Sequence, residues 1–540
     1  MKNIIFTVII VLLIAYCLLP AISSAQFTTL WTQITNNSIS GAGASTADAS
    51  VIYVGGSYVN GSFNDEWRVE KRDLNTGNLD ATFGGGTGYV TGNLGLVNSY
   101  ATAIAVDATG IYVAGHDDST NFNYGWRIEK RNLSTGALIW TKTNNPSASA
   151  DMVSAITVDA TGIYIAGSDY IPGSNQWRIE KRNLNTGVLI WTQTFDASAS
   201  SDVASGIAVD AGGVYIVGSE YPSDCRWRIE KRDLNTGALD ATFGGGTGIV
   251  IIDPSLGNDF AFDITIDATG IYAAGVKWIS GSDWEWYIVK LDLITGAPDA
   301  TFGSGTGVIS TNPSAEDDFA NALTNDANGI YVTGRSWLSG IDYEWRTEMY
   351  HKSTGTLLCS HTSNPSADLD EPNAITVYAG EIYAGGSDWG NYQWHIEKYD
   401  GVCTLPIELL SFTATPYQGN IVLCNWATAT EINNDYFKLE KSTDGINFSS
   451  FANIKGAGNS SVTIYYQYID DDPYTGTSYY RLKQTDYDGT YTYSPIRSIY
   501  IGTINLISIH PNPASDYIQY EVGSEAGGTV TVKVFDVVGR

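Results

Sequence analysis

The sequence predicts an all-β chain whose main part is a seven-bladed β-propeller, and three observations support that prediction. A tryptophan followed by an alternating charged and apolar segment occurs seven times, at Trp67, Trp126, Trp177, Trp227, Trp286, Trp345 and Trp394. A tyrosine after an apolar residue, in a short run that ends in glycine, precedes each tryptophan. The segment 27–35 resembles a strand that the last repeat lacks. Repeats of about 50–60 residues are typical of propeller blades.

Each repeat predicts four short strands. In the third repeat these are SAITVDA (154–160), GIYIAG (162–167), WRIEKRNL (177–184) and VLIWTQTF (188–195), separated by the turn-forming segments 159–162 and 185–187. Three repeats carry a glycine-rich segment in place of the fourth strand, at 79–88, 239–248 and 298–307. We expect a wider excursion of the chain there. These segments resemble a bacterial repeat family marked by an LDxxFG-like sequence, and the resemblance implies a propeller and no particular activity.

The two ends of the repeat region predict how the ring closes. The seventh repeat stops after its third strand, near Asp400. The segment FTTLWTQIT (27–35) resembles the fourth strands of other repeats, such as ALIWTKT (137–143). We therefore expect it to complete the last blade, which would cover an open sheet edge that invites aggregation. The propeller would span residues 26–403.

A different pattern follows at 404–502. Strands are expected at 420–428, 436–441, 461–468, 478–484 and 491–501, which predicts a small β-sandwich. The stretches LPIELLSFTA (405–414), EINNDYFKLEKSTDG (431–445) and GTSYYRLKQTDYDGTYTYS (476–494) closely resemble the immunoglobulin- or fibronectin-like module that precedes sorting domains in Bacteroidetes surface proteins. The segments 507–516 and 532–540 resemble the start of a type IX secretion sorting domain, which implies the type IX secretion machinery as a partner. The family continues for further strands, so we expect a truncated sorting domain at 503–540.

The N-terminus predicts export. Lys2, an apolar run over 4–19 and the small residues Ser23, Ser24 and Ala25 indicate a signal peptide over 1–25, cleaved before Gln26. A transmembrane anchor is the alternative, but the apolar run is short and no later stretch is long enough to span a bilayer. We expect a secreted protein or one on the outer-membrane surface. The net charge of −29 argues against nucleic acid and against anionic membrane surfaces as partners.

The cysteines and histidines offer no recognisable site. After cleavage Cys225, Cys359, Cys403 and Cys424 remain; no CxxC spacing supports a zinc site, and Cys403 can pair with Cys359 or with Cys424. The histidines are scattered and are expected to be single surface or strand residues. They are His116, His351, His361, His395 and His510. No familiar catalytic motif is present.

The repeated segment WRIEKR is interpreted as structural. Its alternation places Trp126, Ile128 and Lys130 on one face of a strand and Arg127, Glu129 and Arg131 on the other. Because the same residue types recur in nearly every repeat, they are expected to serve packing. The charged face would form Arg–Glu ladders between blades.

The loops between the second and third strands are the predicted ligand-binding surface. They differ between repeats and combine aromatic residues with carboxylates, which suits stacking on sugar rings and hydrogen bonding to hydroxyl groups. The candidate residues are Tyr124, Tyr170, Tyr221, Trp278, Trp284, Trp337, Tyr343 and Trp389. The alternative is that these side chains only pack the loop tips.

Five repeats place an aspartate just before their first strand: Asp151, Asp202, Asp259, Asp318 and Asp370. In a closed ring these carboxylates would surround the channel mouth. They are weak candidates for Ca²⁺, because no loop has the ligand density of a calcium site. Hydrogen bonding to the neighbouring blade's backbone is the interpretation that we favour, and no cofactor is expected.

The function expected from the sequence is therefore that of a non-catalytic surface protein that binds a glycan or a protein through one face of the propeller. The alternative is an extracellular polysaccharide-degrading hydrolase or lyase, because propellers host such enzymes. A deep pocket with two or three non-repeated ionisable residues would favour the enzyme. A channel mouth ringed by repeated residues would favour binding.

Overall fold

A computed structural model describes residues 27–36, 42–48, 50–59, 64–92, 98–118, 123–147, 149–196, 200–281, 283–391, 393–401, 409–417, 421–428, 431–460, 463–486 and 491–502, and the backbone of 505–510 and 519–523. The predicted signal peptide, and most of the predicted sorting domain, lie outside these residues. The chain divides into two compact units between Cys403 and Thr404. Within the described residues, no helix has the length and apolarity that crossing a bilayer requires.

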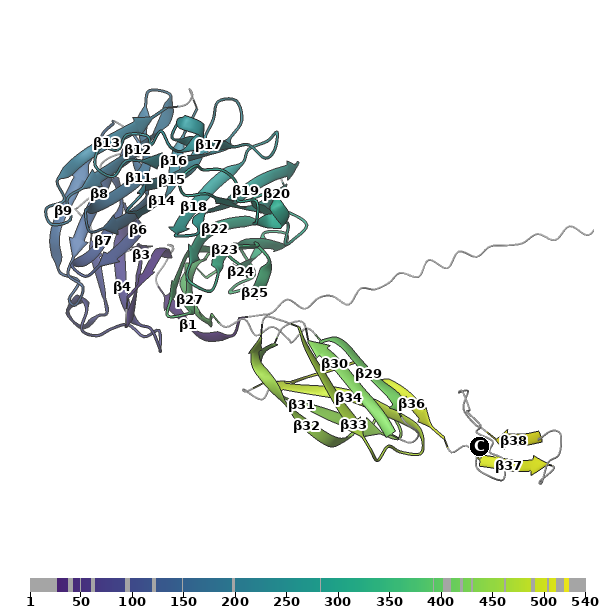
Figure 1. Ribbon diagram of the computed structural model, residues 1–540. Helices are drawn as coiled ribbons and strands as arrows, with labels where there is room; N and C mark the ends of the chain where they lie inside the picture. Colours follow the sequence, from purple (N-terminus) through teal and green to yellow (C-terminus); the bar gives the residue numbers. More distant parts are fainter. Residues whose placement is uncertain are drawn as a thin grey trace, which may run out of the picture. The chain divides into compact units, whose positions relative to one another are not determined.

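The first unit consists of antiparallel sheets of four strands, seven of them among the described residues, drawn in purple to green in Figure 1. The sheets follow one another along the chain, and we number them 1 to 7. Sheet 1 holds β2 (Ala42–Ala47), β3 (Val51–Val59), β4 (Asp65–Asp73) and β5 (Tyr89–Gly92); sheet 2 holds β6 (Ser99–Asp107), β7 (Gly110–Asp118), β8 (Tyr124–Arg131) and β9 (Leu138–Asn144); sheet 3 holds β10 (Met152–Asp159), β11 (Gly162–Ile171), β12 (Ser174–Arg182) and β13 (Leu189–Phe195); sheet 4 holds β14 (Val203–Asp210), β15 (Gly213–Glu220), β16 (Arg226–Arg232) and β17 (Ile249–Ile252). Sheet 5 holds β18 (Phe260–Asp267), β19 (Gly270–Ser280), β20 (Asp283–Leu291) and β21 (Val308–Thr311); sheet 6 holds β22 (Phe319–Asn325), β23 (Ile330–Ser339), β24 (Asp342–Tyr350) and β25 (Leu357–Ser363); sheet 7 holds β26 (Asp370–Tyr378), β27 (Glu381–Asp388), β28 (Gln393–Asp400) and β1 (Thr29–Asn36).

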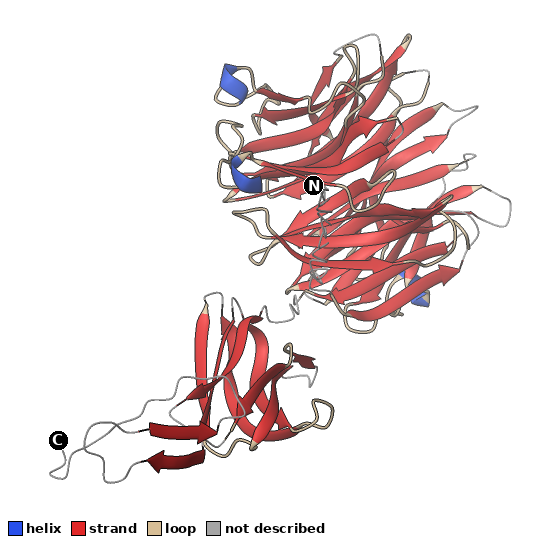
Figure 2. Ribbon diagram, turned by 90° about the vertical axis from the view of Figure 1, so that its right-hand side faces the viewer, coloured by secondary structure: helices blue, strands red, loops and turns tan. Residues whose placement is uncertain are grey.

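The sheets stand around a common axis. The first strand of each sheet contacts the first strand of the next, in the order β2, β6, β10, β14, β18, β22 and β26, and β26 contacts β2 again. The last and first sheets are also joined by the indole of Trp394, whose Nε1 donates to the carbonyl oxygen of Ser57 at 2.9 Å. Figure 2 shows the sheets edge-on, with short 3-10 turns as the helical elements in view. An all-β unit with sheets in closed order around an axis is a β-propeller.

Strand β1 lies at the outer edge of sheet 7, as the sequence predicts. It pairs antiparallel with β28, with Thr32 opposite Glu397 and Thr35 opposite Trp394. The pairing continues at its start, where the Thr28 N–H donates to Asp400 Oδ1 at 2.6 Å and Asp400 N–H donates to Thr28 O. The N-terminal segment therefore supplies the strand that the last repeat lacks.

Side-chain caps explain why the two hairpin turns recur in the sequence. In the first turn, Asp107 Oδ1 accepts hydrogen bonds from the N–H groups of Thr109 and Gly110 at 2.7 and 3.0 Å. In the second turn, Asn132 Oδ1 accepts from Thr135 N–H at 2.9 Å, and the chain then passes through Gly136 at φ +72°. A side chain at Gly136 would meet Phe83 of the preceding sheet at 2.7 Å. Glycine at position 136 is thus favoured both by the backbone conformation of the turn and by the packing of the neighbouring sheets.

The glycine-rich segments do not replace the fourth strand, which corrects the sequence-based expectation. Each forms a 3-10 turn, namely η1 (Gly84–Gly86), η2 (Gly244–Gly246) and η3 (Gly303–Gly305), and a four-residue fourth strand follows. The turn packs against the next sheet, because Gly84 N–H donates to Thr135 O at 3.0 Å. A Cβ at Gly84 would lie 1.8 Å from Tyr89 O, so the close turn requires glycine.

The charged face of the third strand also differs from the expected ladders between blades. In sheet 2, Glu129 is fully buried and accepts from Arg127 Nε at 3.0 Å and from Arg131 Nε at 2.7 Å, both on its own strand. Sheets 1, 3 and 4 repeat this Arg–Glu–Arg triad. The contact with the preceding sheet is made by the guanidinium of Arg127, which lies 4.3 Å from the ring centre of Trp67. The triads therefore neutralise charge within a strand, while the tryptophans link the sheets.

The second unit contains two packed sheets. One has the order β29 (Leu409–Tyr417), β30 (Ile421–Thr428) and β33 (Ile464–Asp470); the other has β32 (Ser449–Ser460), β31 (Glu431–Ser442), β34 (Gly476–Asp486) and β35 (Tyr491–Tyr493), with β36 (Arg497–Ile501) also on β34. Phe412, Trp426 and Phe437 are among the residues that form its core. The sequence did not predict β29 and β32. Farther along, β37 (Asn505–His510) and β38 (Gln519–Gly523) form a hairpin.

The cysteines narrow the pairing that the sequence left open. Cys359, in β25, is disulfide-bonded, whereas Cys225 and Cys424 are buried free thiols. Cys424 is therefore not the partner of Cys403. Cys403 itself lies outside the described residues, so its predicted pairing with Cys359 stays a prediction.

Candidate functional site

The five aspartates that precede the first strands are fully buried and hold two loops together. Asp151 accepts from Ser147 N–H at 2.9 Å and from the Ser147 hydroxyl at 2.7 Å, which folds the loop between sheets 2 and 3. Ser255 does the same for Asp259, Ser314 for Asp318 and Ser366 for Asp370. Burial raises the pKa of Asp318 and of Asp370 to about 6, against the lowering effect of these donors.

The same carboxylates fix the predicted aromatic residues. Asp151 Oδ1 accepts from the backbone N–H of Tyr170 at 2.9 Å. The equivalent bonds join Asp202 to Tyr221, Asp259 to Trp278 and Asp318 to Trp337, at 2.8, 2.8 and 3.2 Å. Each of these four aspartates thus ties the end of the second strand to the loop that enters its own sheet, whereas Trp389 N–H donates to the carbonyl oxygen of Leu369, next to Asp370. The carboxylates are fully buried and are used inside this clip, and their expected place around the channel mouth stays a prediction.

The contact with the preceding sheet's backbone is made by the N–H groups of the same aspartates, whereas we expected it from their carboxylates. Asp151 N–H donates to Tyr124 O at 2.8 Å, and Asp318 N–H donates to Trp284 O at 2.8 Å. Tyr124 and Trp284 begin the third strands of the preceding sheets. One aspartate therefore positions aromatic residues of two adjacent sheets. Within the described part of the chain, no group of three or more His, Cys, Asp or Glu side chains is arranged to hold a metal ion.

The eight predicted ligand-binding residues lie at one end of the sheets. Tyr170, Tyr221, Trp278, Trp337 and Trp389 occupy equivalent places at the ends of the second strands; Tyr124, Trp284 and Tyr343 stand at the starts of third strands. Trp389 is 37% exposed and the other seven are half-buried. The indole Nε1 groups of Trp278 and Trp337 donate within their own hairpins, to Gly281 O and Gly340 O at 3.1 Å. Their use in binding stays a prediction, and we call this end of the sheets the rim.

An aromatic band crosses the rim of sheets 4 to 6. Successive ring centres lie 6.2 Å (Tyr221–Phe260), 6.4 Å (Phe260–Phe262), 6.2 Å (Phe262–Phe319) and 5.9 Å (Phe319–Trp284) apart. All five rings are half-buried, so each keeps accessible surface. The Arg335 guanidinium lies 4.2 Å from the Phe319 ring centre. Two of the residues predicted from the loops are thereby joined to three phenylalanines that were not among the predicted residues.

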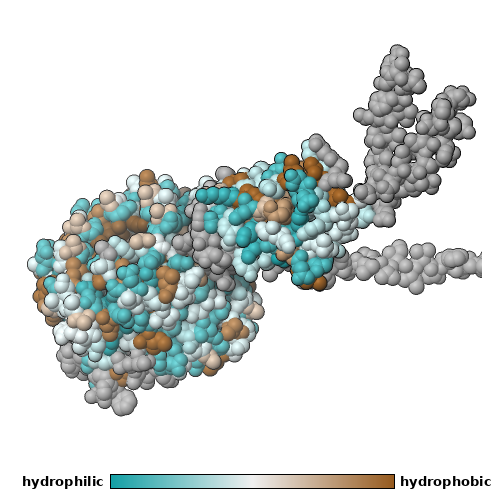
Figure 3. Space-filling model, turned by 90° about the horizontal axis from the view of Figure 1, so that it is seen from below, coloured by the Kyte–Doolittle hydropathy of each residue, from teal (hydrophilic) through white to brown (hydrophobic). Residues whose placement is uncertain are grey.

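Exposed apolar side chains extend the rim on the same sheets. Leu256, in the loop between sheets 4 and 5, is 94% exposed, and Ile341, between β23 and β24, is 69% exposed. On the side of the molecule shown in Figure 3, apolar residues form separate patches among hydrophilic ones. Such isolated patches are ordinary on a protein surface. The aromatic band, whose rings are in mutual contact, is the more distinctive feature.

The band leads to a central channel lined by the first strands. A β-bulge interrupts each first strand at the same place, and the extra residue faces a cavity of about 370 Å³. The seven bulge residues are Gly43, Thr102, Ser154, Ser205, Phe262, Asn321 and Asn373. One wall therefore carries small side chains and the other carries a ring and two amides. Phe262 belongs to both the channel and the aromatic band.

The residue after each bulge is small in every sheet except sheet 5. Ala44, Ala103, Ala155, Gly206, Ala322 and Ala374 occupy this place in the other sheets, and Asp263 occupies it in sheet 5. Its Oδ2 accepts from Leu323 N–H at 2.9 Å and its Oδ1 from Ile264 N–H at 2.8 Å. Burial raises the pKa of Asp263 to about 6, although both backbone N–H groups act to lower it. Aligning the first strands of the seven repeats would have found this residue.

The histidines do not gather into a site within the described residues. His116 packs between the rings of Tyr100 and Tyr124, and burial lowers its pKa to about 4. His395 hydrogen-bonds to Glu397 at 2.8 Å in the place of a repeated arginine, and His361 lies 4.8 Å from the ring of Tyr399. These are single strand residues, as the sequence predicts.

Comparison with known proteins gives a likeness of fold alone. No protein-family model matches the chain, and no curated protein matches it. Among solved structures, BamB from Moraxella catarrhalis is 14% identical, with a TM-score of 0.35 over 69% of this chain and 99% of that one. The periplasmic gluconolactonase PpgL of Pseudomonas aeruginosa is 10% identical, with a TM-score of 0.37 over 79% and 98%. The extracellular domain of the putative hybrid two-component system BT3049 from B. thetaiotaomicron is 11% identical, with a TM-score of 0.37 over 89% and 58%. At these values we take neither activity nor ligand from them.

Proposed function

We propose that this protein is an exported, non-catalytic glycan-binding protein whose ligand lies on the aromatic band at the rim of a seven-bladed β-propeller. The observation that supports it best is the run of five half-buried rings from Tyr221 to Trp284. Aromatic rings offer flat apolar surface for the faces of sugar rings and lose little conformational entropy on binding. Buried aspartates hold the neighbouring loops, so this surface is pre-formed.

The remaining parts of the proposal concern export and domain order. Residues 1–25 would be a signal peptide, 26–403 the propeller, 404–502 an immunoglobulin- or fibronectin-like sandwich that acts as a spacer, and 503–540 sorting-domain sequence for type IX secretion. The change of sequence pattern and the unit boundary between Cys403 and Thr404 support this division. The mature protein would then be secreted or held at the outer-membrane surface. Mass spectrometry of the exported protein tests the cleavage before Gln26.

The alternative of a polysaccharide-degrading enzyme has less support from the channel. Such an enzyme needs two or three convergent ionisable groups in one pocket. Among the described residues that line the channel, Asp263 is the one ionisable group. A single carboxyl group can accept or donate one proton but cannot supply the acid and the nucleophile or base of glycoside hydrolysis. We therefore favour binding.

A glycan screen with the mature chain tests the proposal, scored for binding and for release of sugar ends. We expect binding without product, and Trp284→Ala should weaken it by about tenfold or more, because truncating a central aromatic anchor costs about 2 kcal/mol. Tyr124→Ala is the matched control, since Tyr124 holds the equivalent place in sheet 2 outside the band. Sugar release by the wild type, or equal effects of the two substitutions, would contradict the proposal.

A further inference from the structure

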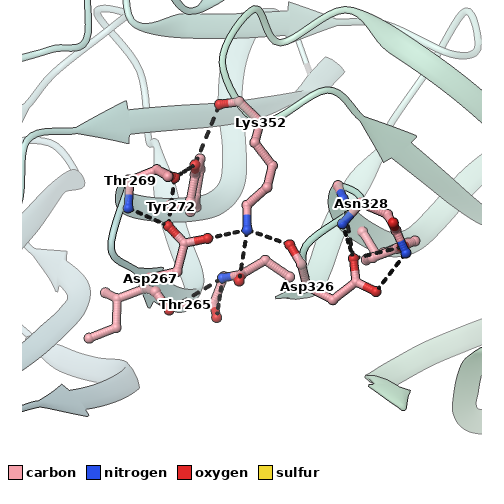
Figure 4. Close-up of polar contacts among 11 residues, drawn as sticks. Thr265, Asp267, Thr269, Tyr272, Asp326, Asn328 and Lys352 are labelled. Atoms are coloured by element: carbon pink, nitrogen blue, oxygen red, sulfur yellow. Dashed lines mark hydrogen bonds and ion pairs between the residues drawn. The ribbon is translucent and has the colours of Figure 1, made fainter. Parts of the chain in front are cut away.

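Strand β18 carries two carboxylates, Asp263 near its middle and Asp267 at its end, and among the described residues only Asp267 has a cationic partner. Asp267, at the turn, forms an ion pair with the ammonium group of Lys352 from sheet 6 (Figure 4). Burial opposes the ionisation of Asp267, but Lys352 and Thr269 outweigh it, so its pKa lies below the usual value. In sheet 5 the repeated lysine of the third strand, Lys290, forms an ion pair with Asp299 at 2.7 Å, so Lys352 is the cation that pairs with Asp267. The negative charge at this end of β18 is therefore balanced.

Asp263, four residues earlier on the same strand, has no such balance. Its oxygens accept two backbone N–H groups, and within the described residues it takes part in no salt bridge. The other six sheets have Ala or Gly at the equivalent position, so the fold does not require a carboxylate there. An amide or a hydroxyl oxygen could accept from Leu323 N–H without a charge. Uncharged side chains already link neighbouring first strands elsewhere, because Asn321 and Thr102 donate to the carbonyl oxygens of Pro372 and Val153.

A half-buried carboxylate without a counter-charge opposes folding, because part of its hydration is lost and two backbone N–H groups offset that loss only in part. Residues that break a local rule without a structural gain are expected at functional sites. The surroundings of Asp263 indicate what the missing partner is. The cavity that it lines also presents the Phe262 ring and the side chains of Asn321 and Asn373. A carboxylate, a ring face and amide oxygens together suit an ammonium group.

We infer that the channel binds the protonated amine of an amino sugar, with Asp263 as its counter-charge, at the end of a glycan that lies on the aromatic band. This inference rests on the proposed glycan binding and adds its chemical class. Phe262 belongs to both the band and the channel lining, so a sugar stacked on the band reaches the cavity. The cavity of about 370 Å³ is within the size range of small-ligand pockets. A metal ion is less suited, because the channel lining offers one carboxylate.

The test compares two hexasaccharides of equal length, one of glucosamine and one of N-acetylglucosamine, by calorimetry with the mature chain near neutral pH. The first carries free amines and the second does not, while both offer the same ring faces. We expect the glucosamine hexamer to bind about tenfold more tightly, and we expect Asp263→Ala and Asp263→Asn to remove that preference, so that each variant binds the two hexamers with equal affinity.

Two controls distinguish a specific ion pair between Asp263 and the sugar amine from a general attraction of a cationic ligand to an acidic protein. Asp471→Asn removes the same charge at an exposed place in the second unit and should keep the full preference. A trilysine peptide supplies ammonium groups without sugar rings and should bind no more weakly to Asp263→Ala than to wild type. Thermal unfolding of each variant shows that the fold is retained.

The outcomes distinguish this inference from the proposed function. If both hexamers bind equally, or if Asp263→Ala keeps the preference, the inference is wrong while glycan binding stands. If trilysine binds tightly and loses affinity in Asp263→Ala, the amine belongs to a polypeptide and the amino sugar is wrong. If neither these hexamers nor any glycan of the screen binds, the proposed function itself fails.

Discussion

The third strands and the first strands of the propeller sheets show two opposite uses of charge. On a third strand such as β8, Glu129 is fully buried between two arginines, and the same triad recurs in sheets 1 to 4. On a first strand such as β18, Asp263 is one of a kind and has no cation among the described residues. Repeated charged groups are thus satisfied by the fold. Asp263, which is not repeated, has hydrogen-bond donors but no cationic partner among the described residues.

This difference teaches where to look for function in a repeat protein. The interfaces between neighbouring sheets impose the same requirements seven times, so the residues that meet them recur. A ligand in the channel or on the rim touches each sheet in a different way, so residues that serve it need not recur. Phe262 stands where the other sheets have a small residue or an asparagine, and Asp263 stands where they have Ala or Gly. The following predictions test this contrast between scaffold and site.

The largest effect should come from removing the strand that closes the ring. Deleting residues 27–36 exposes the edge of β28 and removes Thr35, which accepts from Arg72 at 2.7 Å beside the buried Glu70. We expect the unfolding temperature to fall by about 10 °C or more and aggregation to increase. Differential scanning calorimetry of the deleted and full mature chains measures this. Ile34→Ser is the control, because Ile34 is 50% exposed and should matter little.

Breaking a repeated triad should also destabilise the protein strongly. Glu129→Gln removes the charge that Arg127 and Arg131 share inside sheet 2. Loss of one partner in a buried ionic group costs about 3–5 kcal/mol, because it leaves buried charges unpaired. Urea unfolding gives the change in free energy. Glu285→Gln, which removes the partially exposed pair with Lys277, should cost about 0–1 kcal/mol, and a similar cost for both would remove the distinction between scaffold and surface pairs.

Much of the scaffold could be predicted from the sequence, because its causes are local and repeated. The tryptophans, the turn segments such as 159–162 and 185–187, and the N-terminal strand can all be found because their sequences recur. The prediction of Arg–Glu ladders between blades was wrong. Period-two alternation shows which residues share one face of a strand, but it does not show whether Arg127 pairs with a carboxylate of its own strand or of another strand. The glycine-rich segments were misjudged because a four-residue strand is too short to show alternation.

The candidate site was predicted only in part, for a physical reason. The loop aromatics Tyr221 and Trp284 could be found, since exposed rings in variable loops are conspicuous. Phe262 and Asp263 lie inside a strand whose sequence shows no irregularity. Phe262 faces the channel because it is the extra residue of a β-bulge. A bulge depends on the packing of neighbouring strands. The link between Asp202 and the backbone of Tyr221 joins residues far apart in the sequence, and only the folded chain shows it.

A covalent link offers a smaller test of the scaffold. Cys359 is disulfide-bonded and buried in β25. We expect Cys403 to be its partner, because Cys225 and Cys424 are free and Cys17 precedes the predicted cleavage site. Cys359→Ser should lower the free energy of unfolding by about 2–4 kcal/mol. Non-reducing peptide mapping identifies the partner, and Cys225→Ser is the control for losing a buried thiol.

The smallest expected effect concerns Asp263 and pH. Its pKa in the folded protein is raised to about 6, above the ordinary value of 3.8, so the folded state binds the proton more tightly than the unfolded chain. Its contribution to stability is therefore least favourable above pH 6 and improves as the pH falls through 6 toward 3.8. Comparison with Asp263→Ala isolates this group, because Asp318 and Asp370 titrate in both proteins. Between about pH 7.5 and pH 4.5, the stability of the wild type should rise relative to the variant by about 1–2 kcal/mol. A difference that stays constant with pH would mean that Asp263 is compensated in the absence of ligand, and the channel would then have no need of a cation.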